Sequence, residues 1–151
     1  MEKEITYSYL AGLFDGDGCV FINNHRSLPH GSKHELTVSI GNNNKDVMDW
    51  IICQLRYGHV SKCRTAYNWK CTKKKAIDFL TAIYPFSIIK RKEIELALRF
   101  IEYINYQNKI RLHKPRHKRG GTAPHTKEVI DEIEKYRLKL KDLKGRGSLF
   151  D

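Results

Sequence analysis

Hydrophobic and polar residues follow two kinds of spacing along the chain. The stretches CVFIN and ELTVSIG alternate between apolar and polar residues, as strands with one buried face do. The segment between them, NHRSLPHGSKH, contains Pro29 and Gly31 and is typical of a turn, so a β-hairpin is expected. The stretches HVSKC and YNWKCT predict a second hairpin, connected through residues 64–66.

Helical spacing of apolar residues fills the rest of the chain. It predicts helices from about residue 7 to the glycine-rich residues 16–18, at about 47–55, at about 76–84, from about 88 onward, and from about 126 to 145. Thr6 is expected to cap the first of them. Residues 110–126 show no apolar period and are expected to form a basic loop. The order of elements predicts an α+β fold.

Length and composition narrow the class of protein. The chain has 151 residues, which fits one domain, with a core at residues 1–108 and a basic loop and helix at 109–151 packed on it. No apolar run reaches membrane-spanning length and the first residues do not resemble a secretory signal, so an intracellular protein is expected. The four cysteines form no C-x-x-C pair, which favours free thiols over a zinc or disulfide framework.

Positive charge is concentrated in two stretches of the chain. The net charge is +11, residues 50–92 hold ten Lys/Arg and one acid, and residues 103–127 hold seven Lys/Arg and no acid. Such a distribution is typical of proteins that bind nucleic acid, although runs of solvent-exposed charges also occur in other soluble proteins. An anionic membrane is a weaker candidate, because the basic stretches do not lie on an amphipathic surface helix.

The segment LAGLFDGDG, residues 10–18, ends the first expected helix. Gly12 and Gly16 are four residues apart and share one helical face, where missing side chains allow another helix to come close. Each glycine inside a helix costs about 1 kcal/mol relative to alanine, so a compensating contact is expected. The chain holds no second copy of this helix, so packing against an identical helix of a second chain is the simplest such contact.

Asp15 and Asp17 stand at the end of that helix, where the dipole is negative. Carboxylates are unfavourable there unless a cation or a hydrogen-bond donor compensates them. A divalent metal such as Mg²⁺ would suit the position, because it binds carboxylate, carbonyl, water and phosphate oxygens. The alternative is that both aspartates only accept hydrogen bonds in a tight D-G-D-G turn.

LAGLFDGDG resembles the LAGLIDADG motif of the homing endonucleases and differs from it at Phe14 and Gly16 only. The element order is similar to that family's αββαββα core, in which a curved antiparallel β-sheet forms the DNA-binding face; the C-terminal helix is extra. The single motif resembles the homodimeric, intron-encoded branch. The resemblance implies a dimer interface formed by Leu10, Ala11, Gly12, Asp15 and Gly16, in which Asp15 is more structural than catalytic.

The resemblance also implies an active site. Asp17 and the Gly16 carbonyl would bind Mg²⁺, with Mn²⁺ or Ca²⁺ able to replace it in binding, and Lys90 in PFSIIKRKE would border the metal. Asn42 in LTVSIGNNNKD would organise water, with Asn43 as the alternative register. The family tends to place another basic residue one helical turn later, where this chain has Lys45 followed by an acid, so the identity of a second pocket cation stays open.

DNA contacts are expected from the polar face of the two hairpins and from the basic segment. A twisted antiparallel sheet can lie in the major groove and read base edges, while a basic loop grips phosphates. The expected sheet residues are Asn23, His25, Arg26, Lys33, Glu35, Ser39, His59, Ser61, Cys63, Asn68, Lys70 and Thr72. The expected phosphate contacts are Arg111, Lys114, Arg116, Lys118 and Arg119.

By the resemblance, the chain is expected to be a metal-dependent, site-specific double-strand DNA endonuclease. It would hydrolyse phosphodiester bonds at a long, near-palindromic target as a homodimer and leave short 3′ overhangs. The alternatives are an RNA-binding intron splicing cofactor (maturase), with its own intron RNA as partner, and a non-catalytic DNA-binding regulator. The presence of Asp17 and Lys90 favours the nuclease. The expected location is a prokaryotic cytoplasm or an organelle that carries the intron.

Overall fold

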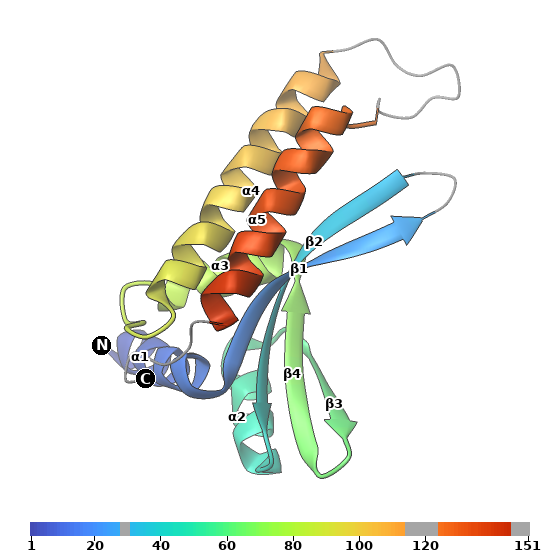
Figure 1. The fold of residues 1–151 in the computed structure, drawn as a ribbon. Coiled ribbons are helices and arrows are strands. Elements are labelled where there is room, and N and C mark those ends of the chain that lie inside the picture. Colours follow the sequence, from blue (N-terminus) through green and yellow to red (C-terminus); the bar gives the residue numbers. More distant parts are fainter. Residues whose placement is uncertain (28–30, 114–123, 146–151) are drawn as a thin grey trace.

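A computed structural model describes residues 1–27, 31–113 and 124–145 of the chain (Figure 1). Its elements are α1 (Glu2–Asp17), β1 (Gly18–Ser27), β2 (Gly31–Asn42), α2 (Lys45–Leu55), β3 (His59–Cys63), β4 (Ala66–Thr72), α3 (Lys73–Ile83), α4 (Arg91–Leu112) and α5 (Lys127–Gly145). The order αββαββα, followed by the two helices α4 and α5, confirms the predicted α+β fold. In the described part of the chain, no helix has both the length and the apolar character needed to cross a membrane.

The four strands form one antiparallel sheet in the order β1-β2-β4-β3. Val20 pairs with Val38, and Val38 pairs with Cys71, so apolar residues of neighbouring strands lie on the same face. The second hairpin closes through Arg64 and Thr65, between the paired Cys63 and Ala66, and Arg64 adopts a positive φ of 55°. Both hairpins predicted from the alternating pattern are therefore confirmed.

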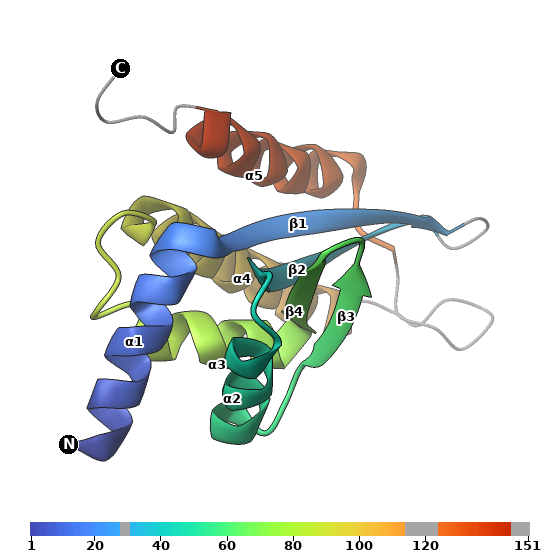
Figure 2. The same cartoon turned by 90° about the horizontal axis from the view of Figure 1, so that it is seen from below.

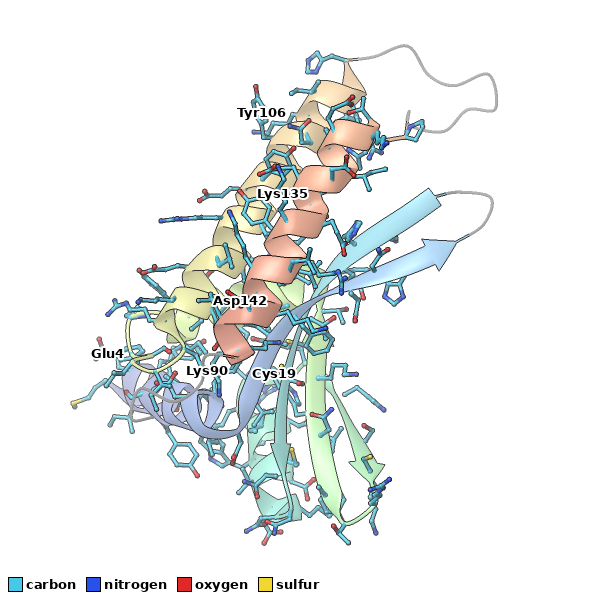
Figure 3. All side chains as sticks on the ribbon, viewed as in Figure 1. Glu4, Cys19, Lys90, Tyr106, Lys135 and Asp142 are labelled. Carbon is cyan, nitrogen blue, oxygen red and sulfur yellow. The ribbon has the colours of Figure 1, made fainter. Side chains whose placement is uncertain are left out.

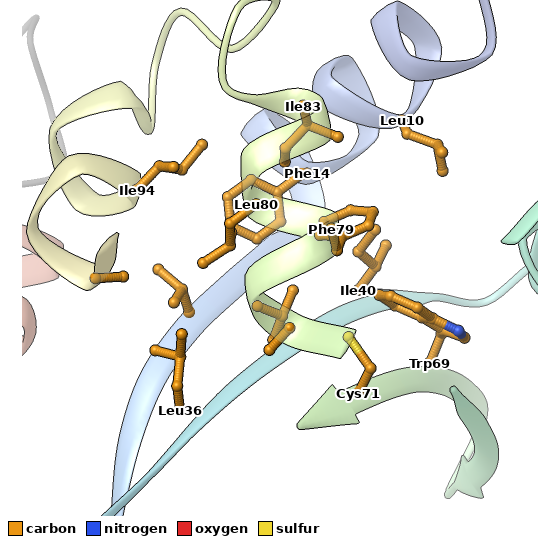
Figure 4. Packing of buried hydrophobic residues seen from close by; sticks show 14 of the residues in the cluster. Leu10, Phe14, Leu36, Ile40, Trp69, Cys71, Phe79, Leu80, Ile83 and Ile94 are labelled. Atoms are coloured by element: carbon orange, nitrogen blue, oxygen red, sulfur yellow. The ribbon is translucent and has the colours of Figure 1, made fainter. Parts of the chain in front are cut away.

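The core lies between one face of this sheet and the helices α1, α3 and α4 (Figure 4). The ring of Phe79 packs between Phe14 and Trp69, with ring centroids 5.9 and 5.1 Å away. The buried Trp69 donates its indole N–H to the Tyr57 carbonyl at 3.1 Å. Gly58 has a φ of 94°, and a Cβ there would lie 2.2 Å from the Trp69 ring nitrogen, so only glycine fits this approach.

Helix α5 runs along α4 and over strand β1 (Figures 1 and 2). Its residues Ile133 and Leu140 belong to the core, because their side chains are almost completely buried. The inward-facing side chain of His34 on β2 lies 3.5 Å from the Glu134 carboxylate of α5. These contacts attach the C-terminal helix to the first hairpin.

Two helix starts and one helix end differ from the prediction. Helix α1 begins at Glu2 and includes Thr6, whose hydroxyl donates to the Glu2 carbonyl inside the helix instead of capping it. Helix α4 begins at Arg91 instead of residue 88, because the amides before it bind a side chain of α1. It extends to Leu112, into the segment expected to be a loop, while residues 114–123 lie outside the described residues.

Candidate active site at the end of helix α1

The Asp15 carboxylate accepts four hydrogen bonds from the segment that leads into α4. Its oxygens bind the Ser87 hydroxyl at 2.5 Å and the backbone amides of Ile88, Ile89 and Lys90 at 2.7, 3.1 and 3.1 Å. Burial by itself raises the pKa of Asp15, but these hydrogen bonds outweigh it and hold the pKa below its ordinary value. Asp15 thus satisfies amides that would otherwise be unpaired at the start of α4.

Asp15→Asn is expected to destabilise the protein at neutral pH by about 2 kcal/mol, because the amides lose a charged acceptor. Since folding lowers the pKa of Asp15, its contribution is complete above the ordinary carboxyl value and is lost as pH falls through the lower folded pKa. Thermal unfolding of both forms from pH 7 to pH 2 should show a difference that shrinks at the acid end. The exposed carboxylate variant Asp131→Asn is the control; a constant difference over the whole range would contradict this role.

Lys90 contacts the carbonyl end of α1, at the junction between α1 and the segment that leads into α4. Its ammonium nitrogen lies 3.0 Å from the Phe14 carbonyl, 2.8 Å from the Asp15 carbonyl and 3.5 Å from the Gly16 carbonyl. A cation at the carbonyl end of a helix compensates the negative end of the dipole. Asp15 and Lys90 therefore bind reciprocally, each satisfying the backbone of the other's element.

Asp17 ends α1 and is exposed. Its carboxylate accepts a hydrogen bond from the Asn42 amide nitrogen at 3.2 Å. The Asn42 amide oxygen in turn accepts from the Asn44 backbone N–H at 2.9 Å, and the Asn44 side chain caps α2 by accepting from Asp46 N–H at 2.9 Å. The geometry thus brings Asn42 to Asp17, while Asn44 has a structural contact.

The oxygen atoms at this junction fit an open divalent-metal site. No group of three or more His, Cys, Asp or Glu side chains able to hold a metal occurs among the described residues. Mg²⁺ does not require such a cage, because it retains waters and binds one or two carboxylates together with substrate phosphates. Asp17 offers an exposed carboxylate, and the Gly16 carbonyl is the one most weakly engaged by Lys90.

The polar face of the sheet lies opposite the core. Strand pairing places the expected readers on it together, for example His59 beside Lys70 and Asn23 beside Glu35. Of these residues, His25, Lys33, His59, Ser61, Cys63 and Lys70 are exposed. The Glu35 carboxylate lies 4.0 Å from His25 and 3.7 Å from Lys73, so the one acid on this face is flanked by basic groups.

Some expected DNA contacts lie elsewhere. Arg111 is half-buried in the last turn of α4, and its side-chain Nε has no hydrogen-bond partner among the described residues. The side chain of Arg26 lies outside the described residues, as do Lys114, Arg116, Lys118 and Arg119. Thr37, which the sequence did not single out, is fully buried on the polar face under Asn23, whose amide donates to it at 3.0 Å.

The residues of the expected dimer face lie on two sides of α1. Gly12 and Gly16 are exposed, and a Cβ added at either would meet no atom within 4 Å. Leu10 and Ala11 are fully buried in the core of the chain itself, so their prediction as interface residues is wrong. They occupy the opposite side of the helix from the glycines, where they pack under the sheet and α3. Asp15 is directed to the start of α4.

The sequence did not reveal two further side chains at this junction. Ser87 is buried and bound to Asp15, and Lys144, at the end of α5, donates to the Cys19 sulfur at 3.0 Å. Figure 3 labels Lys90 and Cys19 in this region. Both contacts join residues more than 70 positions apart, and no local spacing in the sequence marks them.

Comparison with known proteins shows which proteins share this fold. Over 101 residues, 64% of this chain and 62% of the relative, the sequence is 27% identical to the DNA endonuclease I-CreI of Chlamydomonas reinhardtii. No protein-family model matches the sequence. The fold matches the LAGLIDADG homing endonuclease I-SmaMI bound to cleaved DNA, with a TM-score of 0.71 and 20% identity over 93% of this chain and 44% of that one. The chain has the fold of the LAGLIDADG homing endonucleases.

Another LAGLIDADG-fold match covers nearly the whole chain. The homing endonuclease I-CvuI, in complex with the I-CreI target in 2 mM Mg with its DNA not cleaved, has a TM-score of 0.74. It is 15% identical to this chain, and the match covers 99% of this chain and 88% of that one. The chain spans 62% of the length of the curated relative I-CreI.

Proposed function

We propose that this chain is a metal-dependent, site-specific DNA endonuclease that cuts both strands as a homodimer. The observation that carries the proposal is the junction at the end of α1. There an exposed Asp17 lies against Asn42, Lys90 holds the preceding carbonyls, and the polar sheet face begins at the next residues. The I-SmaMI relative with this fold is bound to cleaved DNA, and I-CreI is a DNA endonuclease.

The proposed reaction is hydrolysis of a phosphodiester bond. A water oxygen forms a bond to phosphorus, the bond from phosphorus to the 3′ oxygen breaks, the water proton passes to solvent, and the 3′ oxygen takes a proton from solvent. Bound at Asp17 and the Gly16 carbonyl, Mg²⁺ would supply charge stabilisation and an activated water. Asn42 orients solvent beside Asp17. Lys90 has three N–H donors. Two make short contacts to carbonyls, and a phosphate oxygen would replace the long 3.5 Å contact to the Gly16 carbonyl.

A second copy of the chain is the proposed partner of α1. Ile5 and Tyr9 are 66% and 51% exposed and fall on the same stripe as Gly12 and Gly16. Beside this stripe lies a groove of about 470 Å³ between α1 and α2, lined by Ile5, Thr6, Tyr9, Asp46, Val47 and Trp50. Exposed apolar side chains next to accessible glycines suit close packing of two helices. The two Asp17 carboxylates would then lie near each other and face both strands of a near-palindromic site, with short 3′ overhangs as products.

The polar sheet face is the proposed surface for reading bases. We further propose that residues 109–151 share one domain with the core at 1–108, because α5 buries Ile133 and Leu140 in that core. The basic residues 114–119 would then contact DNA phosphates outside the base pairs that the sheet reads.

The decisive experiment is incubation of the pure protein with DNA that spans the insertion point of its coding intron, with and without Mg²⁺. Cleavage of both strands at one place in Mg²⁺ only, with the ends mapped by sequencing, supports the proposal. Binding of the same DNA without cleavage in Mg²⁺, Mn²⁺ or Ca²⁺ would instead support the alternative of a non-catalytic DNA-binding regulator. Selective binding of the intron RNA alone would favour a splicing cofactor.

Lys90→Met is expected to slow cleavage by about 10- to 100-fold, because the developing charge on the phosphate loses one donor while the metal retains most of the stabilisation. The same substitution also removes the cation from the carbonyls of α1, so thermal stability should fall slightly. Single-turnover cleavage rates give the first effect and thermal melts the second. Lys92→Met, at an exposed neighbouring position, is the matched control. Equal cleavage rates for the two variants would show that Lys90 has a purely structural role.

Variants of the sheet and variants of the basic segment are expected to affect DNA binding in different ways, because one surface reads bases and the other contacts phosphates. Ser39→Ala and Lys70→Ala on the sheet are expected to change the preferred base pair at particular positions, at about 1 to 3 kcal/mol per lost contact. Neutralising Lys114, Arg116, Lys118 and Arg119 together should weaken binding to all DNA and reduce the salt slope by roughly 0.9 per lost contact. Binding titrations against a site library at several salt concentrations measure both effects. The reverse pattern would mean that the two surfaces are assigned the wrong way round.

A further inference from the structure

Two lysines on other helices are candidates for a second cation beside Lys90, Lys45 on α2 and Lys144 on α5. The candidate on α2, Lys45, forms an exposed ion pair with Asp49 at 2.5 Å, on the same helix. That pairing directs the Lys45 ammonium group along α2 toward Asp49. In this structure the α2 lysine is therefore engaged on its own helix.

Lys144 reaches the same junction from α5. Its ammonium nitrogen lies 3.0 Å from the Cys19 sulfur and 5.5 Å from the centroid of the Phe21 ring, and both of those residues are on the polar-face side of β1. Cys19 follows Asp17 by two residues, so their Cα atoms are at most about 7 Å apart. The Lys144 ammonium thus lies at the edge of the site where Asp17 is exposed.

The contacts of Lys144 leave its charge available. A thiol sulfur is a weak acceptor, and the face of a phenyl ring attracts a cation by about 0.5 to 1 kcal/mol when exposed. The Glu93 carboxylate of α4 interacts electrostatically with both Lys90 and Lys144. Burial raises the pKa of Glu93, and the charges of these two lysines lower it in part. Lys90 and Lys144 therefore both interact with the Glu93 carboxylate, near the start of α4 where Asp15 binds.

We propose that Lys144 is the second active-site cation and that its ammonium group contacts a phosphate oxygen of the DNA strand that Asp17 faces. The inference rests on the proposed nuclease function. It gives α5 a part in cleavage, in addition to its packing on α4 and β1. An ammonium group held by weak acceptors can exchange them for a phosphate oxygen, which is a stronger and charged acceptor.

The test compares Lys144→Met with wild type in single-turnover cleavage of the intron insertion-site duplex in Mg²⁺, and in binding of the same duplex in EDTA. Methionine retains an apolar stem over Phe21 and removes the charge. Cleavage is expected to slow by about 10-fold or more, with binding changed less than about threefold. Lys139→Met is the matched control, because it removes the same charge from an exposed position roughly 140° around the same helix.

A substrate series then identifies the phosphate. Each phosphate near the cut is replaced in turn by an uncharged methylphosphonate. At one position on the cleaved strand, Lys144→Met should add no further slowing, since both changes remove the same contact, and elsewhere the two effects should add. Additive effects at every position, or wild-type cleavage by Lys144→Met, would overturn this inference alone. A wild-type protein that cuts no duplex would overturn the nuclease proposal and this inference with it.

Discussion

Asp17→Asn is expected to abolish DNA cleavage, on the order of 10³-fold or more, and to leave DNA binding intact or tighter. The carboxylate is the single charged oxygen ligand that α1 offers at its exposed end, so an amide there removes the metal from the reaction. Binding should persist because asparagine retains the shape and the contact with Asn42 while a negative charge next to DNA phosphates is lost. Single-turnover cleavage in Mg²⁺ and binding in EDTA measure the two effects.

The matched control is Asp131→Asn, which removes one exposed carboxylate from α5. It should cleave at the wild-type rate and bind DNA slightly more tightly through the same change in net charge. Cleavage by Asp17→Asn within a few fold of this control in Mg²⁺ would eliminate Asp17 as the metal ligand. A loss of binding in step with the loss of cleavage would show that Asp17 holds the fold or the DNA instead.

Gly12→Leu is expected to separate the two subunits without unfolding either. Within one chain the position is open, with no atom within 4 Å of an added Cβ, so leucine meets no clash there and improves helix propensity. In the proposed dimer it would hold two helices apart, and overpacking costs about 1 to 3 kcal/mol, which weakens association by about 5- to 150-fold. Sedimentation at micromolar concentration and thermal melts measure the two properties.

Asn108→Leu, an equally exposed position on α4, controls for added hydrophobic surface. It should leave both the oligomeric state and the cleavage rate unchanged. A wild-type chain that sediments as a monomer in the presence of DNA, or a Gly12→Leu dimer with normal cleavage, would refute the proposed α1 interface. A Gly12→Leu variant that melts well below wild type would instead place Gly12 inside the folded chain.

The sheet was predictable because its pattern is local. Alternation fixes which residues of a strand share a face, and a one-residue slip would expose Val38 and Ile40, so the register had one solution. The tight second hairpin followed from the short interval between its strands. The fold class and the polar face then followed from the order of the elements.

The side-chain contacts of the site were less predictable, because they join distant segments. The resemblance assigned Leu10 and Ala11 to the interface together with Gly12, but a shared motif does not show which of its residues face the core of the chain. The Ser87, Lys90 and Lys144 contacts depend on how α4 and α5 dock, and nothing in a window of neighbouring residues specifies that docking. Thr6 failed as a cap because the helix continued through it to Glu2.

The reciprocal binding of Asp15 and Lys90 has a consequence for folding. The two residues are 75 positions apart, so their contact closes a long loop and forms only when the segment before α4 has docked on α1. The first hairpin and α1 could be native-like before then, but the carbonyl end of α1 would lack its lysine. A partly folded chain would therefore hold a formed sheet with an unfinished reaction centre, so that DNA affinity would precede nuclease competence on the folding pathway.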